Sequence, residues 1–325
     1  MRWPIGAFGG GDCRAQAPES IYARRLAGFT LCNMARRPRT ENSSDQSAAN
    51  DGAAVSDDVA KLLAQRHANG GDLWATADGR WNVGTPFSTL ACGLMLTELG
   101  LDPSDPVARG IAQTLLACQT EDGRIRPGPH LTVQPCHTAE AARLLCRLGL
   151  AEDARLSPTV EHLLSNQAAD GGWRCKVLKF GAGPDTDASN PGTTLAALDV
   201  LRFRTPLVTS PEAERAVDTL LDHWSVRRPL GPCRYGIGSR FMKVEFPMFR
   251  YNLFFYVYVL SFYPRARRHE AFRAALAALQ GKLVDGKVVV EHGKPALDVL
   301  SLCRTGIPNS RATHRYAEIV ANLER

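Results

Sequence analysis

The sequence predicts an all-α fold built from repeated helical hairpins, and three observations support this. Apolar residues recur at helical spacing in segments of roughly ten residues, such as 88–99. Gly and Pro punctuate these segments, and both residues end helices. The turns also repeat: a similar glycine turn precedes an apolar helix at five places, namely Gly79, Gly123, Gly172, Gly236 and Gly286.

The helices are expected in order along the chain. Ser56-Asp57-Asp58 can cap a first helix over 59–67, and Gly100 suits the residue just past the end of the second. Pro106 fits the first turn of a third helix. The remaining helices are expected at 138–148, 157–165, 193–203, 211–224, 246–263, 267–283, 295–302 and 311–323, with a hairpin at Asp285-Gly286.

The stretch 163–201 organises the chain. Asp170-Gly171-Gly172 cannot continue a helix, because paired glycines lose much backbone entropy and readily adopt positive φ. Trp173 is then a large apolar side chain just beyond a helix end, and Gln167 can bond the backbone groups left free there. We therefore expect this unit to staple one helix end to its neighbour.

The segment from Gln167 to Trp173 resembles the QW motif of the terpenoid cyclases and of the β subunits of protein prenyltransferases. The resemblance runs from about Asp57 to the end of the chain, with its sharpest match in this third repeat. It implies an α/α toroid, with inner helices around a central cavity and outer helices outside them. The sequence resembles squalene-hopene-cyclase-like bacterial proteins with a single toroid.

Composition divides the sequence into an N-terminal tail and a toroid domain. Residues 1–55 are polar without apolar periodicity and are predicted to be disordered, which leaves 56–325 as one toroid domain. Met34 is an alternative start. The N-terminus has no continuous apolar region of the kind found in signal peptides. The apolar run 253–263 is too short to span a membrane, although peripheral membrane contact stays open.

Charge and cysteine content narrow the function classes. The net charge of +6 is scattered, and no aromatic-interleaved basic stripe argues for nucleic-acid binding. The nine cysteines are odd in number and several lie in apolar helical runs, which is typical of a reducing compartment and favours a cytoplasmic protein. No pattern predicts the oligomeric state.

The candidate acids are Asp187, Asp185 and Glu245. Asp185-Thr186-Asp187 resembles the DxDD motif of class II terpenoid cyclases, which implies that Asp187 is the proton donor and that Asp185 orients it. Ala188 replaces the second Asp of the family's final pair, and helix capping is the alternative role. Glu245 precedes an inner helix, so toroid topology places it at the same end of the ring.

Candidate substrate-binding residues follow from the same topology. Tyr251, Phe255 and Tyr258 belong to the densest aromatic stretch and are expected to face the cavity, where aromatic faces stabilise carbocations or line an apolar pocket. Arg250 and Asn190 stand just before inner helices and are expected as polar anchors at the cavity mouth.

A zinc site is the other chemical candidate. Adjacent Cys136 and His137 could provide a thiolate and an imidazole, completed by His292 from another repeat. The prenyltransferase β subunits bind zinc through an Asp-x-Cys pair and a later His, and this sequence has no such pair at the corresponding place. A buried cysteine beside a capping histidine is the alternative.

These patterns favour three functions. The leading one is a cyclase-like enzyme, an isomerase or lyase, or else a prenyltransferase-like enzyme, acting on an isoprenoid or other hydrophobic substrate in the central cavity. The second is a zinc-dependent transferase or lyase that uses the same cavity. The third is a toroid without catalysis that binds a lipid or a protein.

Overall fold

The computed structural model describes residues 44–175 and 183–325, with side chains from residue 51 onward. The chain divides into two compact units, 1–45 and 46–325, and the second is described here. Most of the predicted tail lies outside the described residues. Helix α1 (Ser44–Ala64) begins upstream of the predicted domain start at residue 56.

The regular structure of the described residues is almost all helical, as the sequence predicts, and turns and irregular segments connect the helices. The other α-helices are α2 (Thr89–Glu98), α3 (Pro106–Leu116), α4 (Pro135–Leu145), α5 (Ser157–Ser165), α6 (Pro184–Asp187), α7 (Pro191–Leu201), α8 (Pro211–Val226), α9 (Leu253–Leu260), α10 (Pro264–Arg267), α11 (Glu270–Gln280) and α12 (Ser310–Leu323). Two short strands, β1 (Leu283–Val284) and β2 (Lys287–Val288), form the hairpin expected at Asp285-Gly286.

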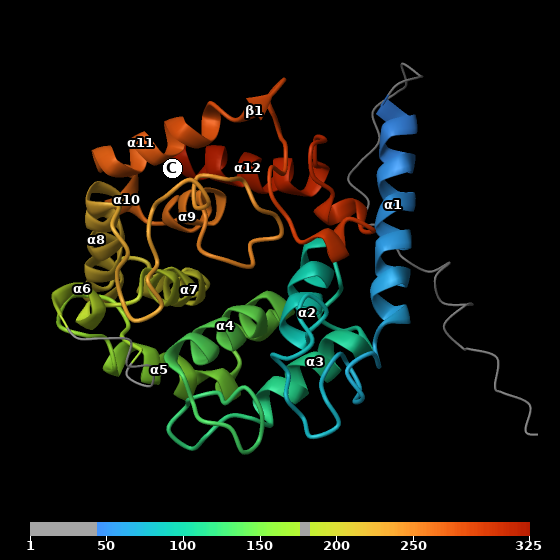
Figure 1. Ribbon diagram of the computed structural model, residues 1–325, viewed down its shortest axis with the longest axis horizontal. Helices are drawn as coiled ribbons and strands as arrows, with labels where there is room; N and C mark the ends of the chain where they lie inside the picture. The colour runs from blue at the N-terminus through green and yellow to red at the C-terminus, as the bar shows by residue number, and fades with distance from the viewer. Residues whose placement is uncertain (1–43, 176–182) are drawn as a thin grey trace, which may run out of the picture. The chain divides into compact units, whose positions relative to one another are not determined.

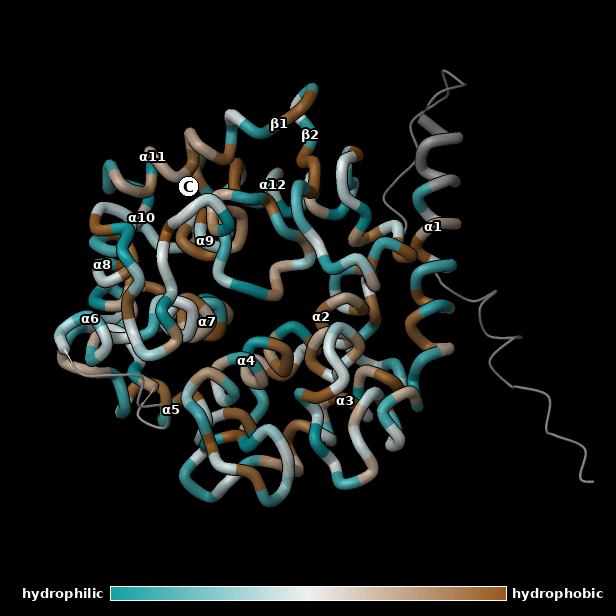
Figure 2. Tube along the Cα trace, viewed as in Figure 1, coloured by the Kyte–Doolittle hydropathy of each residue, from teal (hydrophilic) through white to brown (hydrophobic). Residues whose placement is uncertain are grey.

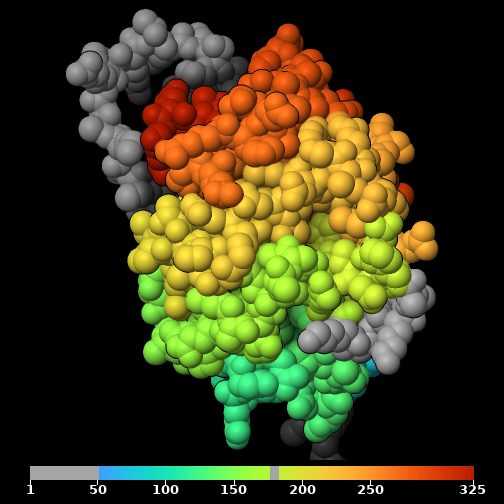
Figure 3. Space-filling model, turned by 90° about the vertical axis from the view of Figure 1, so that its left-hand side faces the viewer, coloured from blue at the N-terminus to red at the C-terminus, as the bar shows by residue number. Residues whose placement is uncertain are grey.

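Inner and outer helices alternate along the chain. Helices α2, α4, α7 and α9 contact one another in sequence order and are called the inner helices here. Helices α3, α5, α8 and α11 pack outside them (Figure 1). When the molecule is viewed from the side, successive segments of the chain form bands from green through yellow to orange (Figure 3). The arrangement is the α/α fold that the repeated hairpins predict.

The core follows the inner helices. All eight residues of α9 are buried, and its sequence is apolar or aromatic throughout. Figure 2 shows hydrophobic residues along α2 and α9, whereas the outer helices α8 and α11 mix hydrophobic with polar residues. A helix that is apolar on every side is expected to be enclosed by others.

Gln167 and Trp173 act as the predicted staple. The Trp173 indole is buried, and its Nε1 donates a hydrogen bond to the Leu163 carbonyl at 2.9 Å. Gln167 Nε2 donates to the carbonyls of Gly171 and Glu212, each at 2.7 Å. Since Glu212 belongs to α8, this turn links two outer helices of neighbouring repeats.

The preceding repeat uses the same device with different residues. Gln119 Nε2 donates to Thr159 Oγ1 at 2.7 Å, and that hydroxyl donates to the Gly123 carbonyl at 2.7 Å. Gly123 has a φ of +81°, and a Cβ there would lie 2.1 Å from the Pro158 carbonyl oxygen. Only glycine fits this close approach between turn and helix.

Three predicted helix boundaries are wrong. Helix α9 starts at Leu253 rather than residue 246, because 246–252 is irregular, contains a cis Phe246-Pro247 bond and ends in the N-cap Asn252. The expected helix 295–302 is replaced by two 3₁₀ turns, since extended Leu300 separates them.

The third wrong boundary concerns the predicted cap at 56–58, which lies inside α1. The Ala-rich residues before it extend the helix, and Asp58 instead accepts hydrogen bonds from the backbone N–H groups of Ser301 and Leu302. The Asp58 carboxylate therefore joins α1 to the 3₁₀ turn Ser301–Cys303. No helix within the described ranges is long and apolar enough to cross a membrane.

Candidate functional site

The two aspartates of the acid motif lie on short helix α6. Both side chains are exposed, and Asp185 Oδ1 accepts a hydrogen bond from Arg228 Nε at 2.9 Å. Asn190, rather than Asp187, caps the inner helix α7, with its Oδ1 accepting from Gly192 and Thr193. Proton donation by Asp187 stays a hypothesis.

Glu245 is the predicted acid that the fold buries. Its Oε1 lies 3.6 Å from Arg240 Nη2 and 3.7 Å from His292 Nε2, and the residue is only 8% exposed. Together with Phe249 and Arg250 these residues line a pocket at the N-terminal ends of the inner helices, here called the N-end pocket. Its volume of about 20 Å³ is enough for about one water molecule.

The predicted zinc ligands do not assemble. Cys136 Sγ contacts Gln134 Oε1 at 3.7 Å, and His137 packs edge-on against Trp81 with ring centroids 6.0 Å apart. His292 instead faces Glu245. Within residues 44–175 and 183–325 no three His, Cys, Asp or Glu side chains come together in a way that could hold a metal ion. Burial also raises the pKa of the Cys136 thiol to about 12.

Only one of the three aromatic candidates borders a cavity. Tyr251 is buried and its hydroxyl lies 2.8 Å from His223 Nδ1, while Phe255 is buried with the Arg143 guanidinium 4.3 Å above its ring. Both therefore belong to the packed interior. Tyr258 lines a cavity at the opposite end of the inner helices from the N-end pocket.

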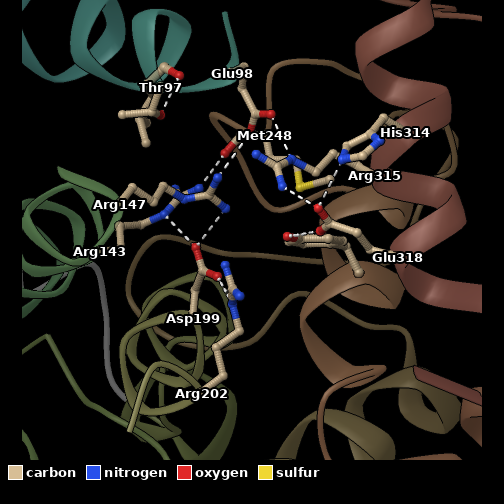
Figure 4. A network of polar contacts seen from close by, with 12 residues as sticks. Thr97, Glu98, Arg143, Arg147, Asp199, Arg202, Met248, His314, Arg315 and Glu318 are labelled. Carbon is tan, nitrogen blue, oxygen red and sulfur yellow. Dashed lines mark hydrogen bonds and ion pairs between the residues drawn. The ribbon is translucent and has the colours of Figure 1, made fainter. Parts of the chain in front are cut away.

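Charged residues fill the interior between the inner helices at that opposite end (Figure 4). We call them the arginine cluster: Glu98, Arg143, Arg147, Asp199, Arg202, Arg315 and Glu318. At its centre, Asp199 is completely buried and accepts hydrogen bonds from Arg143 Nε at 3.1 Å, Arg147 Nη2 at 3.2 Å and Arg202 Nε at 2.5 Å. Burial alone would raise the pKa of Asp199, but the three guanidinium groups hold it well below its usual range.

A second carboxylate extends the cluster to α12. Glu98 accepts from Arg147 Nη1 at 2.9 Å and from Arg315 Nε at 2.7 Å. Arg315 Nη1 donates to Glu318 at 2.6 Å, and Glu318 also accepts from the Tyr258 hydroxyl at 2.7 Å. The cluster therefore joins α2 and the end of α4 to α12 through buried ionic hydrogen bonds.

The position of these arginines follows from the helices. Arg147 stands just after α4 and Arg202 is the C-cap residue of α7, so both meet the partial negative charge of a helix C-terminus. The spacing of charged residues in the sequence indicates this cluster. Arg143 and Arg147 are four residues apart, and Asp199 and Arg202 three, within otherwise apolar helical runs.

A cavity of about 380 Å³ borders the arginine cluster, and we call it the C-end cavity. Its walls include Arg147, Arg202, Phe203, Tyr258, Phe262 and Arg315. The Arg202 guanidinium lies 4.2 Å from the Phe203 ring centroid, 4.3 Å from that of Phe262 and 5.2 Å from that of Tyr258. The cavity thus combines stacked aromatic faces with guanidinium groups.

A larger hollow of about 830 Å³ lies between the glycine turns of the second and third repeats. Its lining includes Glu121, His162, Gln167 and Trp173, which are mostly groups that already staple these turns. It also borders the point where the described chain is interrupted, so we place no site there.

No family model matches the sequence, and no curated protein matches it. Among solved structures, the chain is similar to the type II terpene cyclase MstE from Scytonema without ligand, with a TM-score of 0.46 and 16% identity over 85% of this chain and 80% of that one. A variant of MstE in complex with geranylgeranyl dihydroxybenzoate, its substrate, gives a TM-score of 0.45 at the same identity and coverage. The likeness is one of helical architecture.

Proposed function

We propose that the chain binds an isoprenoid or another hydrophobic molecule in the C-end cavity. The observation that carries this proposal is the cavity itself: about 380 Å³ with Phe203, Tyr258 and Phe262 in its wall. Small-molecule sites typically measure about 300–1,000 Å³ and combine apolar walls with a few convergent polar groups. Perturbed pKa values in the adjoining arginine cluster are a further feature of functional sites.

Binding of farnesol to the full chain, measured by calorimetry, tests this proposal. Phe262 is only partly buried, so Phe262→Ala should leave the fold intact and weaken binding about tenfold, because burial of a phenylalanine side chain contributes about 1.5–3 kcal/mol. Phe249→Ala, at the N-end pocket, is the matched control and should bind like the wild type. Loss of farnesol binding in Phe249→Ala alone would place the ligand at the N-end pocket and contradict the proposal.

A second candidate function is cyclase-like acid catalysis at the N-end pocket. It is favoured by Glu245, a buried carboxyl group whose pocket also contains Phe246 and Phe249. A substrate larger than water would require displacement of the irregular segment 238–252. Glu245→Gln should then abolish turnover of an isoprenoid substrate while Asp187→Asn retains it, and the reverse pattern would support the acid motif instead.

A further inference from the structure

We infer that the C-end cavity holds a subsite for a single carboxylate attached to an aromatic or apolar body. The inference rests on the cavity proposed above as the ligand site, and it adds the chemistry of the head group. Three arginines line this cavity with donors that the protein itself does not use.

Arg147 carries the most telling of these donors. Its side chain is 5% exposed, and its two terminal nitrogens bond Glu98 and Asp199. Its Nε is buried and has no hydrogen-bond partner in the described part of the chain. A buried N–H group without a partner is costly, so an acceptor that penetrates as far as this nitrogen would be stabilised.

Arg202 and Arg315 add further donors at the same wall. Arg202 uses Nε for Asp199, and its Nη1 and Nη2 have no hydrogen-bond partner among the described residues. Arg315 uses Nε and Nη1 for Glu98 and Glu318, which leaves Nη2 likewise without a partner across those residues. The stacking of Arg202 on Phe203 and Phe262 fixes the plane of its guanidinium group.

The charge balance of the site favours one negative charge over two. The four arginines of the arginine cluster already face four carboxylates, because Arg143 pairs with Glu140 as well as with Asp199, and Glu98 and Glu318 complete the set. The C-terminal ends of α4 and α7 add partial negative charge. Arg325 also lines the cavity and contributes one further positive charge. A phosphate dianion would therefore meet an excess of negative charge, whereas a monoanion would not.

The shape of the free donors favours a carboxylate. The two Nη groups of Arg202 form one edge of a planar fork, and a carboxylate accepts two parallel hydrogen bonds from such an edge. The aromatic residues Phe203, Tyr258 and Phe262 beside that edge would contact the body of the ligand. A small aryl carboxylate satisfies both features and fits within about 380 Å³.

Three probes with one phenyl group but different head groups test the inference on the full chain by calorimetry. Sodium benzoate should bind at least tenfold more tightly than neutral benzamide, and phenyl phosphate should bind no more tightly than benzoate. Equal binding of benzoate and benzamide, tighter binding of phenyl phosphate, or no benzoate binding at millimolar concentration would each overturn the inference.

Arg202→Lys keeps the charge and removes the planar fork, so it should reduce the preference for benzoate over benzamide. Arg204→Lys is the matched control, because Arg204 bonds the Ala151 carbonyl instead and should retain the preference. A preference in Arg202→Lys as large as in the wild type would refute the assigned role. If that variant melts early, Arg315→Lys, at a more exposed position, makes the same test.

The farnesol titration separates this inference from the proposed function. Farnesol binding without a benzoate preference would leave the proposed function standing and refute the carboxylate subsite. A preference for benzoate without farnesol binding would support the carboxylate subsite and refute the proposed function.

Discussion

Asp199→Asn tests the arginine cluster most sharply, because it removes one charge with almost no change of shape. The Asp199 carboxylate is completely buried and accepts from three guanidinium groups, at 2.5–3.2 Å. Asparagine leaves those cations without their shared counter-ion in a region that water does not reach. Removal of one partner from a buried ion pair costs about 3–5 kcal/mol. At about 2–4 °C per kcal/mol, the expected fall in Tm is roughly 6–20 °C.

The stability lost in Asp199→Asn should depend on pH. The pKa of Asp199 in the folded chain is held well below its usual range. The unfolded chain takes up a proton at this residue below about pH 4, whereas the folded chain does not, so wild-type stability falls as pH decreases. The asparagine variant lacks this titration. The stability gap should therefore be full above about pH 5 and narrow by about 1.4 kcal/mol per unit below pH 4.

Thermal and urea unfolding, followed by circular dichroism from pH 3 to pH 8, measure both effects. Asp218→Asn is the matched control, because Asp218 pairs with Arg265 on the surface and such exposed pairs contribute about 0–1 kcal/mol. An Asp199→Asn variant that loses no more stability than Asp218→Asn would refute the assigned role of the cluster.

Further substitutions test the staples and the acid motif. Trp173→Ala should cost about 3–5 kcal/mol in urea unfolding, because the indole is buried and hydrogen-bonded; a loss below about 1 kcal/mol would contradict its role as a staple. Gly123→Ala should destabilise by more than about 1 kcal/mol, since φ is positive and the Cβ would meet a carbonyl, whereas Gly238→Ala in open space should be neutral. Asp187→Asn should change stability by less than about 0.5 kcal/mol because the side chain is exposed, and a larger loss would reveal a structural role.

The repeated hairpins could be predicted because their boundaries are set locally. In the structure Ser88 and Asp105 each cap the helix that follows them with their own side chain. The start of α9 was placed too early, because the aromatic stretch begins at Phe246, whereas the backbone of 246–252 is irregular and the helix starts only after the N-cap Asn252. Hydrophobicity alone does not distinguish a buried loop from a buried helix.

The candidate site was only partly predictable. Toroid topology brings Glu245, Arg250 and His292 to one pocket, as expected from their positions before inner segments. Asp199 and Arg147 were not among the predicted site residues, although charges inside apolar helical runs indicate buried pairing. Their partners lie on helices far apart in sequence, so only the fold shows which charges meet.

A photoreactive farnesol analogue, cross-linked to the full chain and mapped by mass spectrometry, tests most directly where the hydrophobic ligand lies. We expect labels in 258–262 and 318–322, two segments that line the C-end cavity. Labels concentrated in 245–250 and 292–297 would place the ligand at the N-end pocket and contradict the proposed site.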